Sequence, residues 1–248
     1  MNELLLIFTL LFIYGSALLA YKLFGKSGLF ALTPIATIVA NIEVLLVIKA
    51  FGWTQTLGNI PFAVTFLITD ILSECEGKKS ANKAVYIGIF STVFFLVVSQ
   101  IWLLFTPDET DHCMAAFQTI FRNSPRVILA SLTVYAVSQL TDVWLYHMWW
   151  NLTERLCGDK RRFLWFRNNF STLISQFINN VLFTLLAFYG TFDLKTVWSF
   201  IVSSYIIFII TSLLDTPFVY AARYIHDKEQ EKKQKNAAAD AANAPTAA

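Results

Sequence analysis

Long apolar stretches separated by short polar connections make up most of the chain. Seven of them stand out, over residues 4–21, 29–51, 60–74, 84–105, 124–150, 168–189 and 196–221. Most have the roughly 20 residues that a helix needs to cross the hydrocarbon core of a bilayer. The third is the shortest and the most polar, so a broken or re-entrant helix is the alternative there. The pattern predicts an all-α, polytopic bundle of seven transmembrane helices surrounded by lipid.

The basic residues predict the orientation of this bundle. If all seven stretches cross, all but four of the 19 Lys and Arg residues lie on one side, and the four exceptions are Lys49, Arg122, Arg126 and Lys195. The positive-inside rule then places the amino terminus outside and the carboxyl terminus in the cytoplasm. Because orientation accounts for the basic residues, the net charge of +2 indicates no nucleic-acid partner. A re-entrant third stretch would reverse everything before it and is disfavoured.

The composition agrees with a membrane protein and divides the chain in two. Hydrophobic residues make up 56% and charged residues 15%, against about 25% charged in a soluble domain. The first stretch lacks the basic leader of a signal peptide, so we expect one transmembrane domain over residues 1–226. Residues 227–248 are charged and then Ala-rich, so we expect a cytoplasmic tail that is disordered or helical only in its first turns. The spacing of the three cysteines supports neither a disulfide nor a metal site, and no cofactor is expected.

Five carboxylates lie inside or at the ends of the apolar stretches: Glu43, Asp70, Glu74, Asp142 and Asp215. A charged side chain at membrane depth costs at least about 2.5 to 3.5 kcal/mol on insertion scales. Each of these carboxylates must therefore face a partner, a cavity or a transported solute. The chain is expected to hold something polar inside the membrane.

Local alternatives exist for two of these carboxylates. Asp70 and Glu74 stand one helical turn apart and repel each other, which suits proton coupling or a ligand rich in hydrogen-bond donors. Glu74 could instead reach the cytoplasmic interface and pair with Lys78. Asp215 precedes Thr216 and Pro217, a pattern that also suits a helix cap, since Asp favours the cap position and Pro the first turn.

Polar side chains form one stripe on each of two predicted helices. Within 124–150 the stripe is Ser131, Tyr135, Ser138, Gln139 and Asp142, and within 168–189 it is Asn168, Thr172, Ser175, Gln176 and Asn179. The spacing places each set on one helical face. Hydrogen bonding between helices, at around 0.6 kcal/mol per bond, is enough to explain the serines and threonines. The larger groups exceed that need and predict a polar lining: Gln139, Asp142, Gln176 and Asn179.

Several motifs carry a family resemblance. The chain has Thr-Asp-Ile-Leu-Ser-Glu at 69–74, Arg-Asn-Asn-Phe-Ser-Thr-Leu-Ile-Ser-Gln at 167–176 and Asp-Thr-Pro at 215–217. With these pieces in the expected helix order, it resembles the queuosine precursor transporter family, also called the vitamin uptake transporter family, over roughly 41–223. The resemblance implies an inner-membrane importer, not an enzyme. Its implied purine-like substrate is a 7-deazaguanine precursor of queuosine: the 7-cyano form, the 7-aminomethyl form or queuine.

The resemblance also implies a set of site residues. Family positions are occupied by Asn41, Asp70, Glu74, Arg126, Gln139, Asp142, Arg167, Asn169, Gln176 and Asp215. Asp70 or Asp142 would accept from the donor edge of the base, amides would serve its carbonyl, and Tyr135 would stack on the ring. The chain departs from the family at Cys75, usually aromatic, and at Asn179, usually Asp. The loss of a carboxylate at 179 leaves the precursor open and favours a neutral or bulkier one.

Other function classes have less support. The family's likeness to the substrate-binding subunits of energy-coupling-factor vitamin transporters leaves open a binding subunit that needs a separate energising partner, although the family is expected to work without an ATPase. No G-x-x-x-x-G-K-[ST] loop is present in the sequence, so no ATPase is built in. H-E-x-x-H and G-x-S-x-G are likewise missing from it, which argues against an intramembrane enzyme. A homodimer stays open.

Overall fold

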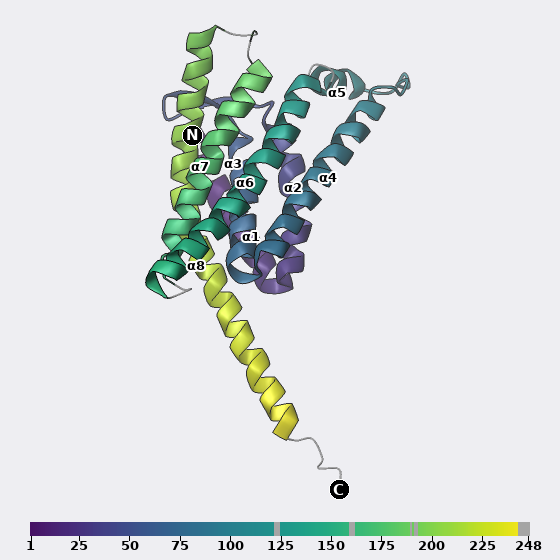
Figure 1. Cartoon of the computed structure of the whole chain (residues 1–248). Helices are drawn as coiled ribbons and strands as arrows, with labels where there is room; N and C mark the ends of the chain where they lie inside the picture. Colours follow the sequence, from purple (N-terminus) through teal and green to yellow (C-terminus); the bar gives the residue numbers. More distant parts are fainter. Residues whose placement is uncertain (122–124, 159–161, 189, 191–192, 243–248) are drawn as a thin grey trace.

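The computed structural model of the chain describes residues 1–121, 125–158, 162–188, 190 and 193–242. In that part of the chain it is a bundle of helices with one β-hairpin (Figure 1). The helices are α1 (Asn2–Phe24), α2 (Lys26–Glu43), α3 (Asn59–Cys75), α4 (Lys78–Trp102), α5 (Met114–Phe121), α6 (Pro125–Cys157), α7 (Leu164–Phe188) and α8 (Leu194–Ala242). The strands are β1 (Val47–Ala50) and β2 (Trp53–Thr56).

The long helices alternate in direction, so the bundle has two ends. The hairpin, α5 and the amino terminus lie at one end, which we call the hairpin end (Figure 1). The connections α1–α2, α3–α4 and α6–α7 lie at the other, which we call the basic end. Asn2 Nδ2 donates to the Lys49 carbonyl at 2.9 Å, which holds the start of α1 against the hairpin.

Each predicted apolar stretch contains one long helix, and the prediction of an all-α polytopic membrane bundle is confirmed. Among the described residues, α1, α4, α7 and α8 contain spans long and apolar enough to cross a membrane. Large apolar side chains such as Phe8 on α1 and Phe90 on α4 are exposed, whereas Asp70 and Gln139 are fully buried. This inside-out polarity is typical of helices surrounded by lipid. The count of seven crossings stays a prediction.

Helix α3 is continuous from Asn59 to Cys75, so the broken-helix alternative is wrong. Pro61 stands at its third position, in the first turn, where a missing N–H breaks no helical hydrogen bond. The helix packs against α1, α2, α4, α6 and α8, and nearly all of its side chains are buried. Its polarity therefore reflects a central place among other helices, where it faces protein rather than lipid.

The hairpin and α5 were not predicted from the sequence. The apolar stretch 29–51 predicted one helix, but α2 ends at Glu43 and β1 begins at Val47. Phe51 and Gly52 join the strands with φ angles of 53° and 81°. Positive φ at both central residues is the mark of a type I′ turn, whose twist matches that of paired strands. This tight turn closes the hairpin instead of extending the helix.

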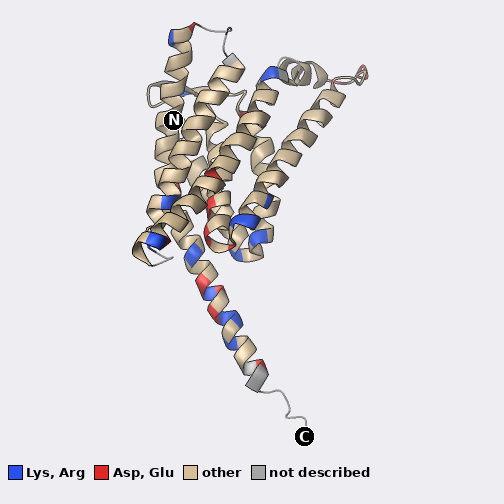
Figure 2. Cartoon of the chain, in the orientation of Figure 1, with Lys and Arg blue, Asp and Glu red and all other residues tan. Residues whose placement is uncertain are grey.

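The basic residues divide between the two ends as predicted (Figure 2). Lys49 lies in β1, and Arg126 and Lys195 stand at the starts of α6 and α8, all at the hairpin end. The other described Lys and Arg residues lie at the basic end or in the tail. Residues 122, 160 and 161, which also entered the prediction, lie outside the described residues.

Helix α8 leaves the bundle at the basic end and continues into the tail (Figure 1). It remains helical through Ala242, further than the first turns expected beyond 227. Glu, Lys, Gln and Ala are all good helix formers, which accounts for the extension without tertiary contacts. Residues 243–248 lie outside the described residues, and the division at 226 stays a prediction.

Candidate functional site

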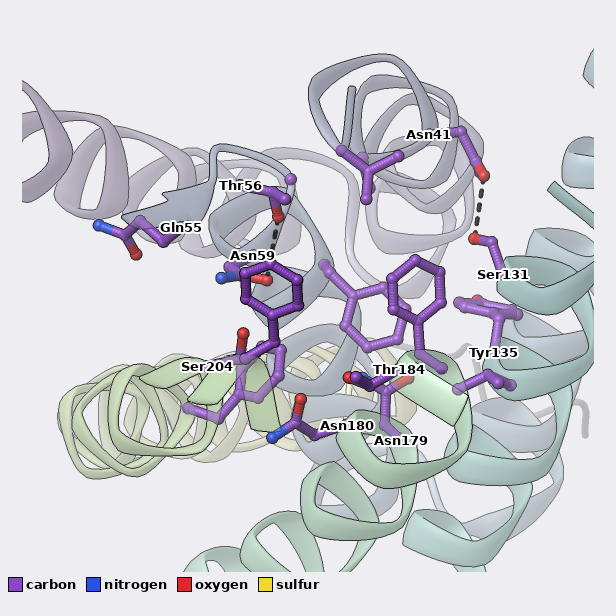
Figure 3. A pocket seen from close by; sticks show the side chains of 18 of the residues that line it. Asn41, Gln55, Thr56, Asn59, Ser131, Tyr135, Asn179, Asn180, Thr184 and Ser204 are labelled. Atoms are coloured by element: carbon purple, nitrogen blue, oxygen red, sulfur yellow. Dashed lines mark hydrogen bonds between the residues drawn. The ribbon is translucent and has the colours of Figure 1, made fainter. Parts of the chain in front are cut away.

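A cavity of about 250 Å³ lies between the helices in the half of the bundle nearest the hairpin (Figure 3). Its walls come from α2, the hairpin, the start of α3, α4, α6, α7 and α8. The polar lining residues are Thr37, Asn41, Gln55, Thr56, Asn59, Thr92, Ser131, Tyr135, Asn179, Asn180, Thr184 and Ser204. None of the described residues that line it is Asp, Glu, Lys, Arg or His. The cavity thus offers hydrogen bonds without a formal charge.

Asparagine side chains from α2, α3 and α7 line this cavity (Figure 3). Ser131 Oγ donates to Asn41 Oδ1 at 3.0 Å, which ties α6 to α2 across one wall. Thr56 Oγ1 donates to Asn59 Oδ1 at 3.4 Å beside the hairpin. The Nδ2 atom of Asn59 is buried and has no partner among the described residues. A ligand carbonyl or ring nitrogen would satisfy such a donor.

Aromatic rings form the apolar part of the lining. Phe62 lies edge-on to Tyr135, with ring centroids 6.2 Å apart, and 6.5 Å from the ring of Phe208. Tyr135 lies so close to α4 that a Cβ atom at Gly88 would stand 2.0 Å from its hydroxyl oxygen. Glycine at 88 is therefore what lets the Tyr135 ring occupy this wall.

A fully buried polar layer lies next to the cavity, toward the basic end. Gln139, one turn along α6 from Tyr135, donates from Nε2 to Thr65 Oγ1 at 2.6 Å. Its Oε1 accepts from Thr69 Oγ1 at 3.1 Å. Both threonines belong to α3, so Gln139 joins α6 to the central helix immediately beneath the cavity.

Two carboxyl groups meet in this layer, and we call them the carboxyl pair. Asp70 accepts from Thr172 Oγ1 at 3.0 Å, and Asp142 accepts from Ser175 Oγ at 2.7 Å. Both carboxyl groups are fully buried, and they are close enough to interact electrostatically. The pair joins α3 and α6 through neighbouring positions on a single face of α7.

Asp215 makes a contact between helices rather than a cap. Its Oδ1 accepts from Asn168 Nδ2 at 2.7 Å, and the neighbouring Thr216 Oγ1 accepts from Asn169 Nδ2 at 2.7 Å. Helix α8 runs through Asp215 and Pro217 without ending. The capping alternative is therefore wrong, because α8 does not begin here and Asp215 accepts from a side chain of α7 instead.

A buried ion-pair cluster closes the basic end. Arg167 Nη2 donates to both carboxylate oxygens of Glu74, at 2.7 and 2.6 Å, and its Nε donates at 3.0 Å. Tyr146 Oη donates to the same carboxylate at 2.7 Å, and Arg223 lies 3.2 Å from it. The Arg167 guanidinium also lies over the Trp150 ring, 4.2 Å from its centroid.

The alternative that Glu74 pairs with Lys78 is wrong. Its carboxylate is only 3% exposed and pairs with arginines from α7 and α8, not with Lys78 on the next helix. The cluster fastens α3, α6, α7 and α8 to one another at the basic end.

The structure distributes the predicted site residues over three levels. The cavity is lined by Asn41, Tyr135 and Asn179. The polar layers beneath it hold Asp70, Gln139, Asp142, Asn169, Gln176 and Asp215. Glu74 belongs to the ion-pair cluster. Arg126 lies exposed at the hairpin end, where its Nε donates to the Leu186 carbonyl at 2.7 Å, and it does not line the cavity.

Other lining residues were not singled out from the sequence. Asn180 follows Asn179 directly, so the Asn-Asn pair on α7 was a signal that could have been used. Asn59 begins α3 just before the stretch that was read as a span. Gln55 and Thr56 belong to the hairpin, and no helical periodicity could have placed them against the cavity.

Comparison with known proteins supports the resemblance inferred from the motifs. Residues 56–222 match the family described as "Putative vitamin uptake transporter". The "Probable queuosine precursor transporter" of Bacillus subtilis (strain 168) is 38% identical over 206 residues, which cover 83% of this chain and 88% of that protein. No solved structure matches the chain. The chain therefore belongs to the vitamin uptake transporter family and is a multi-pass membrane transporter, not an enzyme.

Proposed function

We propose that the protein imports a queuosine precursor, a 7-deazaguanine-type base, across the cell inner membrane. The observation that carries this proposal is the uncharged cavity of amides and aromatic rings, in a chain 38% identical to a protein named as a queuosine precursor transporter. Such a base is flat, with N–H donors and a carbonyl acceptor along one edge. Amide side chains can both donate to and accept from that edge.

The size and shape of the cavity suit a single small base. Sites for drug-sized ligands occupy about 300 to 1,000 Å³, and this cavity has about 250 Å³. Tyr135 and Phe62 supply ring faces and edges near the amides. Stacking on such side chains is worth about 1 to 3 kcal/mol per base in proteins that bind single-stranded nucleic acids, and it requires only a π-face on the ligand.

The lining favours the neutral 7-cyano precursor over cationic forms. Asp70, Asp142 and Asp215 lie beneath the cavity and Glu74 lies in the ion-pair cluster, so none of these carboxylates is among the lining residues. An uncompensated cation would lose hydration without gaining a counter-charge. Asn179, the amide where the family usually has Asp, lines the cavity and contributes to this neutrality.

The distribution of charge supports a direction of transport. With the basic end in the cytoplasm, the cavity lies in the outer half of the membrane and receives solute beside the hairpin. The ion-pair cluster then closes the cytoplasmic side. Release inside requires α7 and α8 to separate from α3 at Glu74, which is alternating access by movement of helix groups around a central site.

Uptake by the purified protein tests the proposal. Proteoliposomes should take up radiolabelled 7-cyano-7-deazaguanine saturably, and Asn179→Leu should slow this uptake at least tenfold, because it replaces an amide in the lining. Glu43→Gln, a half-buried change on α2 outside the lining, is the control and should retain uptake. Uptake no greater than that of empty liposomes would remove the import claim. Tight binding without uptake would instead favour the subunit that needs an energising partner.

A further inference from the structure

The carboxyl pair of Asp70 and Asp142 has an unexplained hydrogen-bond pattern. One oxygen of each carboxyl accepts from a hydroxyl of α7, that of Thr172 or of Ser175. The other oxygens, Asp70 Oδ1 and Asp142 Oδ2, are buried and meet no hydrogen-bond donor among the described residues. The two carboxyl groups are held by hydroxyls three residues apart on one face of α7 and are close enough to interact electrostatically. Two ionised carboxylates at such close range repel each other, and a proton bound between them removes that repulsion.

Among the described residues, none supplies a neutralising charge to the pair. The described titratable side chains that face it are Asp215 from α8, Tyr14 from α1 and Tyr146 from α6. Tyr14 donates its hydroxyl to the Thr211 carbonyl at 3.3 Å, and Tyr146 donates to Glu74. Arg167 is also engaged by Glu74, one turn along α3 from Asp70. A proton shared by the pair both supplies the missing donor and removes one buried charge.

A second polar side chain links this pair to the cavity. Gln176 is fully buried, and neither its Oε1 nor its Nε2 has a partner among the described residues. It stands one turn from Thr172 on the face of α7 that contacts the carboxyl pair. One turn further, Asn179 lines the cavity. Along α7, Gln176 thus stands between the residue that binds Asp70 and the residue that lines the cavity.

We propose that the Asp70–Asp142 carboxyl pair is a proton-binding site and that the protein carries its solute inward together with a proton. This inference rests on the proposed import function and adds its driving force. The pair takes up a proton while the cavity faces outside and releases it once the ion-pair cluster has opened toward the cytoplasm. No bond of the solute changes, and one proton moves inward with each solute molecule.

The test uses proteoliposomes of the full chain with a pH-sensitive dye inside. With the outside made more acidic by one pH unit, labelled 7-cyano-7-deazaguanine should accumulate about tenfold at one proton per solute. Adding solute outside at equal pH should acidify the lumen of wild-type vesicles. This second measurement needs no variant, so it holds even if substitutions in the pair prevent folding.

Variants test the carboxyl pair, and wild-type exchange of labelled for unlabelled solute separates coupling from import. Asp142→Asn should abolish the pH-driven accumulation, and Asp142→Glu should restore part of it. The Glu43→Gln control should behave as wild type. Wild-type exchange with no response to the pH gradient, or accumulation driven by a sodium gradient instead, would overturn the proton site and leave import standing. Wild-type vesicles that neither exchange nor accumulate solute would overturn import itself.

Discussion

Single residues of the lining decide which charge the cavity accepts. Asn179→Asp would place a carboxylate in an otherwise uncharged lining. We expect the ratio of uptake of the 7-aminomethyl to the 7-cyano precursor to rise about tenfold or more, because a cation gains a partner while the neutral base loses an amide donor. Competition between the two labelled bases measures this ratio. An unchanged ratio would contradict the account of selectivity by lining charge.

Glu74 tests how much one buried ion pair contributes. Glu74→Gln leaves Arg167 buried without its counter-charge, which typically costs about 3 to 5 kcal/mol, so the melting temperature of the purified protein should fall markedly. Glu76→Gln, two residues along, is the matched control: this side chain is 20% exposed, lies 3.8 Å from Lys26 and accepts from the Tyr21 hydroxyl. Gln keeps an acceptor for Tyr21, so the change should cost less than about 1 kcal/mol. Equal losses of stability in the two variants would show that the ion-pair cluster contributes no more than an ordinary surface ion pair.

Helical periodicity predicted which residues turn inward but not which partners they meet. Gln139, Asp142 and Gln176 were marked as a lining because their spacing keeps them on one face, and all three are buried. The partner of Glu74 was sought one turn away, at Lys78, whereas Arg167 stands 93 positions further along the chain. Local spacing cannot predict contacts between residues far apart in the sequence, because these depend on how distant helices pack.

At the level of elements, the approach of α4 to α6 shapes one wall of the cavity. In Gly88→Ala the new methyl group would lie 2.0 Å from the Tyr135 hydroxyl, so the ring must move. We expect the KM for uptake to rise several-fold with little change in melting temperature, since the ring end can swing aside. Gly15→Ala on α1, where a Cβ would meet nothing within 4 Å, is the control. An unaltered KM in Gly88→Ala would remove Tyr135 from the site.

The hairpin shows where apolar pattern alone fails as a predictor of elements. The run Leu45, Leu46, Val47 and Ile48 is as apolar as a helix, and the sequence predicted that α2 continues through it. The structure instead pairs β1 with β2 about the turn at Phe51 and Gly52. Short apolar runs suit either element, and tertiary position over the cavity decides between them. The long helices, whose length leaves no such choice, were predicted at the right places, although α8 continues well beyond the predicted end at 221.

For the whole molecule, two native cysteines report the orientation. Cys113 and Cys157 are both exposed, the first in the loop before α5 at the hairpin end and the second at the last position of α6 at the basic end. An impermeant maleimide should label Cys113 in intact cells and Cys157 only after the membrane is made permeable. Cys113→Ser and Cys157→Ser variants identify each signal. The reverse order of labelling would refute the inward direction derived from the basic residues.

The central claim is that the protein binds a queuosine precursor in this uncharged cavity and imports it into the cell. It is tested most directly by the queuosine content of tRNA in cells that cannot synthesise or otherwise import the precursor. Cells expressing the chain and fed the 7-cyano base should regain queuosine in their tRNA, and cells expressing Asn179→Leu at equal membrane level should regain far less. The account would be contradicted if tRNA from cells expressing the unaltered chain lacked queuosine, or if cells expressing Asn179→Leu recovered as much queuosine.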